Sequence, residues 1–366
     1  MADGAMPSAA AHGRRSARRS RAAAKSARKP GTLYGALDLG TNNCRLLIAT
    51  ASQYGFKVVD SYSQIVRLGE GLGASGVLCD AAMQRAAGAL QVCARKLKRL
   101  RVRRMRCVAT QACRAADNGA AFLHDVHEST GLRLQTISTE QEARLAVRGC
   151  ANLIDKACDA ALVVDIGGGS TELSWVDLRE DTNGGRIRPG PCVSLPIGVV
   201  NMAERFPECD ERGPWFAAMR AFAREQVGGF EGANAFAKLF RDGDVHCIGT
   251  SGAVTSLGGL HLNLPRYIRS KVDGLWLSRR AVEEATARLL AKNQAERACE
   301  PCIGKDRADL VLAGCAILAA IEDVWPTPRI RVADRGLREG LLLGMIGADR
   351  RRARHRHMHK KGDGGK

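Results

Sequence analysis

The first part of the chain that predicts regular structure alternates apolar and polar residues as strands do. LYGALDLG, CRLLIAT and FKVVDSYS, all within residues 33–63, are short apolar runs separated by turn residues, and they predict a three-stranded meander. From residue 80 the period becomes helical in DAAMQRAAGALQVCARKLKRL, whose last turns hold basic residues that suit the helix dipole. RCVAT and RLQTIS then predict strands on either side of a helix in GAAFLHDVHEST, and a helix follows from Thr139 to about Ile154.

The same pattern begins again near Ala160. ALVVDIGGGSTELSWVDL predicts strand, turn and strand, and its segment from Asp165 aligns without gaps with the segment from Asp38, DLGTNNCRL. A repeat at this separation indicates two similar domains. The next segment, VHCIGTSGAVTSLGGL, predicts a strand, a glycine-rich turn and a helix. A buried helix is predicted for the almost wholly apolar ADLVLAGCAILAAIEDVW. A last strand and helix are predicted for RIRVADRGLREGLLLGMI. We therefore predict an α/β protein with domains at residues 32–157 and 158–347.

The net charge of +18 lies mainly at the two ends of the 366 residues. Residues 1–30 hold eight Lys or Arg and one Asp, residues 349–366 hold eight Lys or Arg and two Asp, and the body between them therefore carries only +5. We predict a disordered basic arm at residues 1–31 and an unfolded, basic, His-containing tail at residues 348–366, both able to bind polyanions. Aromatic residues are only 4% of the chain, which argues against stacking platforms for single-stranded nucleic acid.

Cysteine usage and hydropathy favour a cytoplasmic protein without a membrane segment. The thirteen cysteines are odd in number and scattered, as in proteins of a reducing compartment. Cys299 and Cys302 form a C-x-x-C pair without a second pair at ligand spacing, so idle thiols are favoured over a zinc or redox site. No apolar run approaches the roughly 18 residues that a membrane helix needs, and no apolar segment follows the basic N-terminus.

The segment VVDIGGGSTELSW carries the first indication of chemistry. Three glycines after Asp165 allow the backbone to approach a ligand closely, and bare N–H groups suit an anion. Asp165 and Glu172 are seven residues apart across a tight turn, so both carboxylates can point to one mouth and hold a cation that accompanies the anion. Asp38 has the equivalent place in the first repeat. The alternative for each acid is a local role, as an aspartate that caps its own turn.

Seven segments resemble, in order, the exopolyphosphatase/guanosine pentaphosphate phosphohydrolase (Ppx/GppA) family of the actin, sugar kinase and Hsp70 superfamily: YGALDLGTNNCRLLI, VATQACRAADN, STEQEARL, VVDIGGGSTELSW, SLPIGVV, CIGTSGAVTSLGG and DRGLREGLL. They cover roughly residues 33–347, and STEQEARL separates this family from the kinases. The resemblance implies two actin-like (ribonuclease H-like) domains that face a central cleft, in the short form without C-terminal helical domains. DRGLREG departs from the family's pattern at Arg335 and Gly336, where Gly-Ala is more usual.

The resemblance also implies roles for individual residues. Glu142 matches the catalytic glutamate that orients water, although Thr139-x-x-Glu142 is also a capping box. Asp38, Asp165 and Glu172 would hold Mg²⁺, and a monovalent cation such as K⁺ is compatible with the site. Arg45 and Arg114 would bind phosphate bidentately, with a surface ion pair as the alternative. The remaining phosphate-binding candidates are Gly40, Thr41, Asn42, Asn43, Gly167, Gly168, Gly169, Ser170, Ser251 and Gly252, of which the last two precede a helix N-terminus.

From these features we predict an enzyme that removes the terminal phosphate of inorganic polyphosphate with Mg²⁺ and a water oriented by Glu142. Removal of the 5′ γ-phosphate of guanosine pentaphosphate (pppGpp) is the alternative within the family. An ATP-binding kinase or regulatory module of the same superfamily is an alternative from another class, but it leaves the STEQEARL glutamate unexplained. Nucleic-acid binding through the basic ends is a third. Relatives suggest a homodimer.

Overall fold

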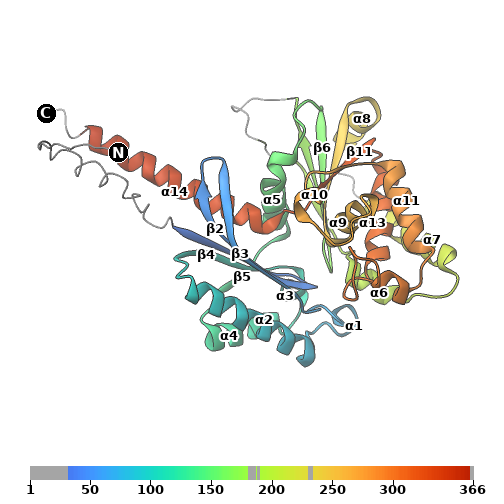
Figure 1. Ribbon diagram of the computed structural model, residues 1–366, viewed down its shortest axis with the longest axis horizontal. Coiled ribbons are helices and arrows are strands. Elements are labelled where there is room, and N and C mark those ends of the chain that lie inside the picture. Colours follow the sequence, from blue (N-terminus) through green and yellow to red (C-terminus); the bar gives the residue numbers. More distant parts are fainter. Residues whose placement is uncertain (1–31, 180–186, 188–189, 230–233, 363–366) are drawn as a thin grey trace, which may run out of the picture. The chain divides into compact units, whose positions relative to one another are not determined.

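The computed structural model describes residues 32–179, 187, 190–229 and 234–362 (Figure 1). The described residues belong to one unit that begins at Thr32. The predicted basic arm at residues 1–31 lies outside them. None of the described helices is both long enough and apolar enough to cross a membrane.

The first sheet is built from the N-terminal meander and two crossover strands. Its strands are β1 (Leu33–Leu39), β2 (Asn43–Ser52), β3 (Gly55–Ile65), β4 (Arg104–Ala109) and β5 (Leu134–Thr136). Their order is β3-β2-β1-β4-β5, with β1 to β3 antiparallel and β4 and β5 parallel to β1. Alternate residues of β1 and β2 pack to opposite faces. Leu37 and Leu46 join the core under α2 (Asp80–Arg99) and α4 (Gly119–Thr130), whereas Ala36 and Leu47 face α14 (Leu337–Gly362).

The second sheet repeats this arrangement. Its strands are β6 (Ala160–Ile166), β7 (Thr171–Asp177), β8 (Cys192–Leu195), β9 (Val245–Thr250), β10 (Trp276–Ser278) and β11 (Arg329–Ala333). In the order β10-β11-β9-β6-β7-β8, β6 to β8 form the antiparallel meander and β9 and β11 run parallel to β6. An extra antiparallel strand, β10, pairs with β11. Two sheets with one topology confirm the predicted α/β class and its actin-like repeat.

The helices of the second half mostly cover one face of its sheet. α7 (Arg212–Gly228), α9 (Gly252–His261), α11 (Arg279–Leu290) and α13 (Val311–Val324) contribute to its largest apolar core. α13 is the apolar helix that the sequence predicts, and 11 of its residues are buried. The shorter helices are α1 (Leu72–Ser75), α3 (Gln111–Ala115), α6 (Val199–Arg205), α8 (Asn234–Asp242), α10 (Arg269–Val272), α12 (Gln294–Ala298) and the 3₁₀ helix η1 (Ala151–Leu153).

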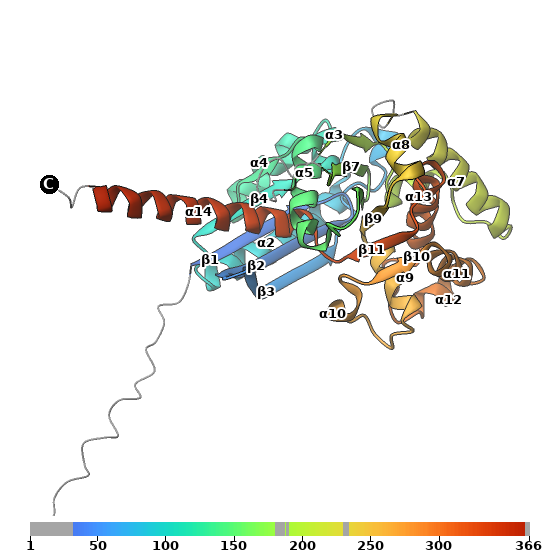
Figure 2. The ribbon, with the colours of Figure 1, turned by 90° about the horizontal axis from the view of Figure 1, so that it is seen from above.

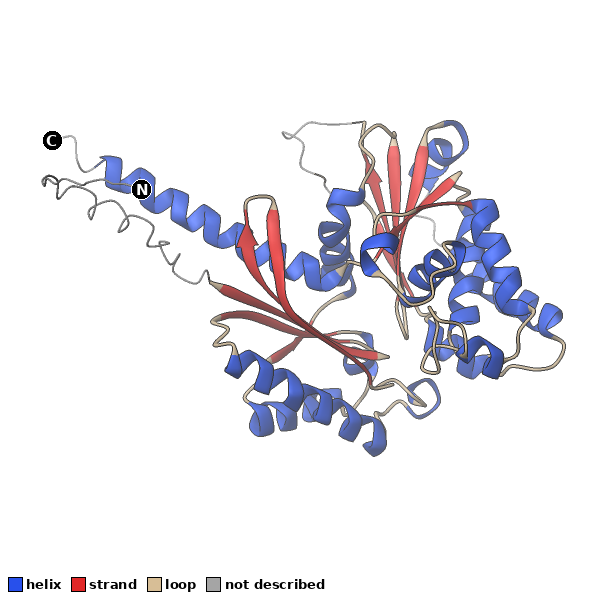
Figure 3. Cartoon of the chain, in the orientation of Figure 1, coloured by secondary structure: helices blue, strands red, loops and turns tan. Residues whose placement is uncertain are grey.

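Helix α5 (Thr139–Cys150) lies between the two sheets (Figure 3). Leu145 packs with α14 and the first sheet, and Val147 and Cys150 pack against β6 and β9 of the second sheet. The backbone of α5 lies very close to α14 and to Gly336 just before it. A Cβ added at Gly149 would lie 1.9 Å from Gly336 O, and one added at Gly340 would lie 2.1 Å from Leu145 O. Because α5 is held from both sides, its first turn has a defined position between the two halves of the protein.

The prediction of an unfolded tail at residues 348–366 is wrong for most of that segment. α14 continues to Gly362 and runs along β1 before extending past the sheet (Figure 2). Ala, Arg, Met and Lys are strong helix formers, and neither Pro nor Gly interrupts the segment before Gly362. Asp349 also ties the helix to the first sheet, because its carboxylate accepts hydrogen bonds from Arg104 Nε at 3.0 Å and Tyr34 Oη at 3.2 Å.

Candidate active site

Two equivalent hairpin turns face each other between the sheets. Gly40 N donates to Asn43 O at 2.8 Å in the first turn, and Gly167 N donates to Ser170 O at 2.8 Å in the second. The turns also touch, because a Cβ added to Gly168 would lie 2.9 Å from Thr41 Cβ and 3.0 Å from Asn42 N. None of the three consecutive glycines has a positive φ. Close approach, rather than a left-handed backbone, is therefore what requires glycine here.

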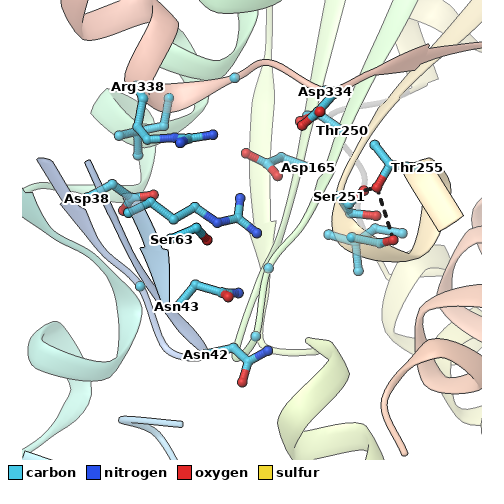
Figure 4. Close-up of a pocket in the computed structure, with 18 of the residues that line it drawn as sticks. Asp38, Asn42, Asn43, Ser63, Asp165, Thr250, Ser251, Thr255, Asp334 and Arg338 are labelled. Carbon is cyan, nitrogen blue, oxygen red and sulfur yellow. Dashed lines mark hydrogen bonds between the residues drawn. The ribbon is translucent and has the colours of Figure 1, made fainter. Parts of the chain in front are cut away.

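The space behind these turns is a cavity of about 410 Å³. In Figure 4, Asp38, Asn43 and Ser63 lie on one wall, and Asp165, Thr250 and Ser251 come from the opposite sheet and the start of α9. The cavity is lined by all the predicted site residues except Arg114, namely Asp38, Gly40, Thr41, Asn42, Asn43, Arg45, Glu142, Asp165, Gly167, Gly168, Gly169, Ser170, Glu172, Ser251 and Gly252. We call this cavity the cleft.

Three of the cleft's acids are the predicted metal ligands. Asp165 and Glu172 are directly opposite in the β6–β7 ladder, so their side chains leave the same face of the sheet. Glu172 Oε1 accepts hydrogen bonds from Ser170 Oγ at 2.7 Å and Ser194 Oγ at 2.8 Å. Burial raises the pKa of Asp38, of Glu172 and of Asp165, the last to about 8. The cleft therefore holds buried acids that a cation would stabilise in their charged form.

The local alternative for the two aspartates, a turn cap, is wrong for this structure. Neither Asp38 nor Asp165 accepts a hydrogen bond from any backbone N–H of the described residues. Their carboxylates face the cleft instead.

Glu142 lies in the first turn of α5 and is only 8% exposed. The helix cap is Ser138, whose Oγ accepts from Gln141 N at 3.3 Å, so the capping-box alternative for Glu142 is wrong. The Glu142 carboxylate instead lies 3.3 Å from Arg114 Nη1, and the same nitrogen donates to Ile137 O at 2.8 Å. Burial first, and the charge of Glu172 second, raise the pKa of Glu142 to about 9. A carboxyl with a strongly shifted pKa in a cleft marks a candidate functional group.

Sequence reasoning missed Arg338, which the first turn of α14 places in the cleft. Its side chain extends into the space between Asp38 and Asp165 (Figure 4). Burial lowers the pKa of Arg338. Arg338 belongs to the DRGLREG segment, three positions after the Arg335 that departs from the family's pattern, so this segment carried the signal for both arginines. The Arg335 guanidinium pairs with Asp273, with Nε 3.0 Å from Oδ2, at the rim of the cleft.

The cleft has more cationic side chains than the sequence predicted. Arg269 is held by Glu339 at 3.0 Å and Asp334 at 3.3 Å. By contrast, Arg45, Arg307 and Arg338 line the cleft and form no ion pair with any residue that the structure describes. Unpaired arginines around buried acids make a site that suits an anionic ligand together with a cation.

The cysteine pair has no comparable surroundings. Cys299 is exposed, and Cys302 is a buried free thiol whose Sγ lies 3.7 Å from Leu264 O. Over residues 32–362, as far as they are described, no three His, Cys, Asp or Glu side chains form a metal-binding group by themselves.

Comparisons with known proteins agree with this geometry. A family model described as the Ppx/GppA phosphatase family matches residues 47–348. The solved Aquifex aeolicus member of the Ppx/GppA family is 26% identical, with a TM-score of 0.71 over 87% of this chain and 98% of its own. An exopolyphosphatase-like protein is also 26% identical, with a TM-score of 0.74 over 86% and 98%. An exopolyphosphatase from Cytophaga hutchinsonii shares the fold, with 23% identity and a TM-score of 0.75 over 87% and 98%.

Proposed function

Because the chain belongs to the Ppx/GppA phosphatase family and is therefore a phosphohydrolase, we propose that it is an exopolyphosphatase. It removes the terminal phosphate of inorganic polyphosphate, using Mg²⁺ and a water that Glu142 orients. The observation that carries this proposal is the position of Glu142: a buried carboxyl with a raised pKa beside two glycine turns in a cleft with unpaired arginines.

The residues of the cleft supply each part of a phosphoanhydride hydrolysis. Backbone N–H groups of the two turns donate hydrogen bonds to the terminal phosphate. The water oxygen attacks the terminal phosphorus in line with the bridging oxygen, the phosphoanhydride bond breaks, and the shortened chain leaves with that oxygen. Glu142 accepts the proton of the water. Burial raises the pKa of Glu142, and the neighbouring Arg114 guanidinium opposes this by favouring the ionised form, which is the form that accepts a proton.

The buried acids fit a divalent cation. Asp165 and Glu172 would hold Mg²⁺ directly or through its waters, and Asp38 of the opposite half would contact the ion through water, since the three acids do not form one direct ligand group. When bound, Mg²⁺ would neutralise charge on the transferred phosphoryl group. The seryl hydroxyls of Ser170 and Ser194 orient the Glu172 carboxylate for this role.

The cations of the cleft favour a substrate with several phosphates in a row. Arg45, Arg307 and Arg338 extend the positive charge beyond the two turns. Among the residues that the structure describes, only two aromatic ones, Tyr62 and Tyr267, line the cleft, and Tyr267 Oη donates a hydrogen bond to Asp334 at 2.7 Å. A long phosphate chain uses the arginines along its whole length, which supports polyphosphate as the substrate.

The test is orthophosphate release from long-chain polyphosphate and from guanosine pentaphosphate, side by side, with Mg²⁺ and with a chelator. We expect Mg²⁺-dependent release that is faster from polyphosphate. Orthophosphate release from guanosine pentaphosphate alone would show that guanosine pentaphosphate, not polyphosphate, is the substrate. Inactivity on both substrates, with transfer of phosphate from ATP to a small molecule, would show that the protein is a kinase. The homodimer stays a prediction, to be tested by light scattering of the purified protein.

A further inference from the structure

A second cavity lies behind the turn that carries the three glycines. It has a volume of about 430 Å³, similar to that of the cleft, and we call it the rear pocket. Three residues, Gln111, Gly169 and Ser170, line both cavities. The rear pocket is completed on its far side by β8 and by the start of α5, with Cys192, Ser194 and Thr139 among its lining residues.

The wall between the two cavities is thin. Gln111 closes it, with Oε1 accepting from Thr41 Oγ1 at 2.9 Å, and a Cβ on Gly169 would lie only 2.2 Å from that same Oε1. Beside Gln111, the Glu142–Arg114 ion pair crosses the wall, because Glu142 lines the cleft and Arg114 lines the rear pocket. The Gln111 side chain, the turn at Gly169 and Ser170, and one ion pair therefore separate the proposed site of hydrolysis from the rear pocket, and the amide side chain is the flexible part of this wall.

Cleavage of the terminal phosphate from a long polyphosphate chain gives orthophosphate that needs its own exit route. This argument rests on the proposed function. The terminal phosphate is cleaved beside Glu142, and the rest of a long chain fills the cleft between that point and its mouth. Orthophosphate that leaves through the mouth must pass a polyanion in a narrow cleft, against like-charge repulsion. A short substrate has no such obstacle, since its product leaves the cleft after each cleavage.

The chemistry of the rear pocket suits a weakly held anion in transit. Arg114 supplies a permanent positive charge, and Ser194 supplies a hydroxyl. The first turn of the 12-residue helix α5 opens on the pocket at Thr139 and Glu140, and it directs the positive end of the helix dipole there. The Glu140 carboxylate opposes tight binding, because the Ser138 hydroxyl lowers its pKa and keeps it charged.

We propose that the rear pocket is an orthophosphate site through which the cleaved phosphate leaves while a long polyphosphate chain stays in the cleft. Gln111 is its gate: release of the Thr41 hydrogen bond lets the side chain swing aside, and Arg114 draws the anion from Glu142 into the rear pocket.

The experiment narrows the rear pocket without touching the cleft. Cys192→Trp and, independently, Thr139→Trp place an indole in the rear pocket at residues that do not line the cleft. Cys209→Trp is the matched control, at an exposed cysteine outside both cavities. Thermal unfolding of each variant checks that it is folded. Rapid mixing then separates orthophosphate formed in the first turnover, after an acid quench, from steady-state release.

For both rear-pocket variants we expect steady-state release from long polyphosphate to fall about tenfold, because product exit becomes limiting. The first turnover should keep the wild-type rate, and turnover of tripolyphosphate should stay within about twofold of wild type. Unchanged release from long polyphosphate would overturn the proposal, as would an equal loss on long and short substrates. A wild-type protein inactive on polyphosphate would instead refute the proposed function, so the two failures are distinguishable.

Discussion

Replacing Glu142 with glutamine separates catalysis from stability, because the structure predicts opposite signs for the two. The substitution keeps the size of the side chain and a hydrogen-bond acceptor for Arg114, but it removes the proton acceptor. Loss of a positioned general base costs at least about a hundredfold in turnover, which corresponds to about 2.7 kcal/mol of barrier. Binding of polyphosphate should persist, since Glu142 does not supply the phosphate donors of the two turns.

The same change should stabilise the metal-free protein. Burial raises the pKa of Glu142 from its ordinary 4.5 to about 9, and the attraction of Arg114 is already included in that value. At about pH 7.5 the folded state therefore bears a cost of about 4 kcal/mol, which corresponds to the three pH units between 4.5 and 7.5. Because glutamine is neutral and does not bear this cost, we expect the variant to gain up to about 4 kcal/mol of stability and to melt at a higher temperature.

The assay is orthophosphate release from long polyphosphate with Mg²⁺, together with thermal unfolding without Mg²⁺. Glu128→Gln, at an exposed position on α4, is the control for loss of a negative charge and should leave both measurements unchanged. Near-normal turnover of Glu142→Gln would show that Glu142 is not the base. A lower melting temperature would show that the carboxylate stabilises α5 or the Arg114 pair more than its burial costs.

Three further predictions test the rest of the structure. Gly168→Val should abolish both turnover and polyphosphate binding, because its Cβ would lie 2.9 Å from Thr41 Cβ and force the turns apart. The control is Gly73→Val, at a position where an added Cβ meets no atom within 4 Å. An active Gly168→Val protein would show that this turn is not part of the site. Glu322 is 4% exposed and burial raises its pKa to about 7, so wild-type stability should fall as pH rises from about 4.5 to 7. Urea unfolding should accordingly find Glu322→Gln more stable than wild type by about 3 kcal/mol at pH 8 but not at pH 4.5, and an equal difference at both pH values would contradict this origin. Deleting residues 1–30 and 356–366, while keeping Asp349, should weaken the binding of long polyphosphate at low salt and make that binding less dependent on salt. Turnover of short substrates should stay within about twofold of wild type. If the salt dependence of binding is unchanged, the basic ends bind another partner.

Local signals in the sequence were sufficient for the α/β fold class and for the two turns of the cleft, and the family resemblance supplied the remaining candidates. The two strand-Asp-x-Gly turns could be predicted because a hairpin is specified by residues that are neighbours in the chain, and both turns have the same 2.8 Å hydrogen bond at the same offset. Once two equivalent turns were placed at the ends of equivalent strands, their residues had to meet in one cleft. All the candidates except Arg114 do line it, and Arg114 contacts it through Glu142.

Local signals in the sequence did not decide whether the Glu142 side chain caps its helix or faces the cleft as a base. That choice depends on Ser138, which caps the helix, and on Arg114, which is 28 positions away in the chain and holds the carboxylate in the cleft. The continuation of α14 to Gly362 was misjudged for a related reason. Charge pattern suggested an unfolded tail, whereas helix propensity and the anchoring of Asp349 by Tyr34, 315 positions away, favour the helix.

The sequence by itself determined which segments become strands and helices, that the chain contains two copies of one motif, and which acids and glycines stand at their turns. Only the tertiary structure decided how those groups behave. It brought Arg338 of α14 beside Asp38 of β1, buried the acids deeply enough to raise their pKa, and left Gln111 as a thin wall in front of a second pocket. The physical reason is that backbone propensity is set by adjacent residues, while burial and the electrostatic field at a site are set by side chains hundreds of positions apart, which meet only when both sheets pack against α5.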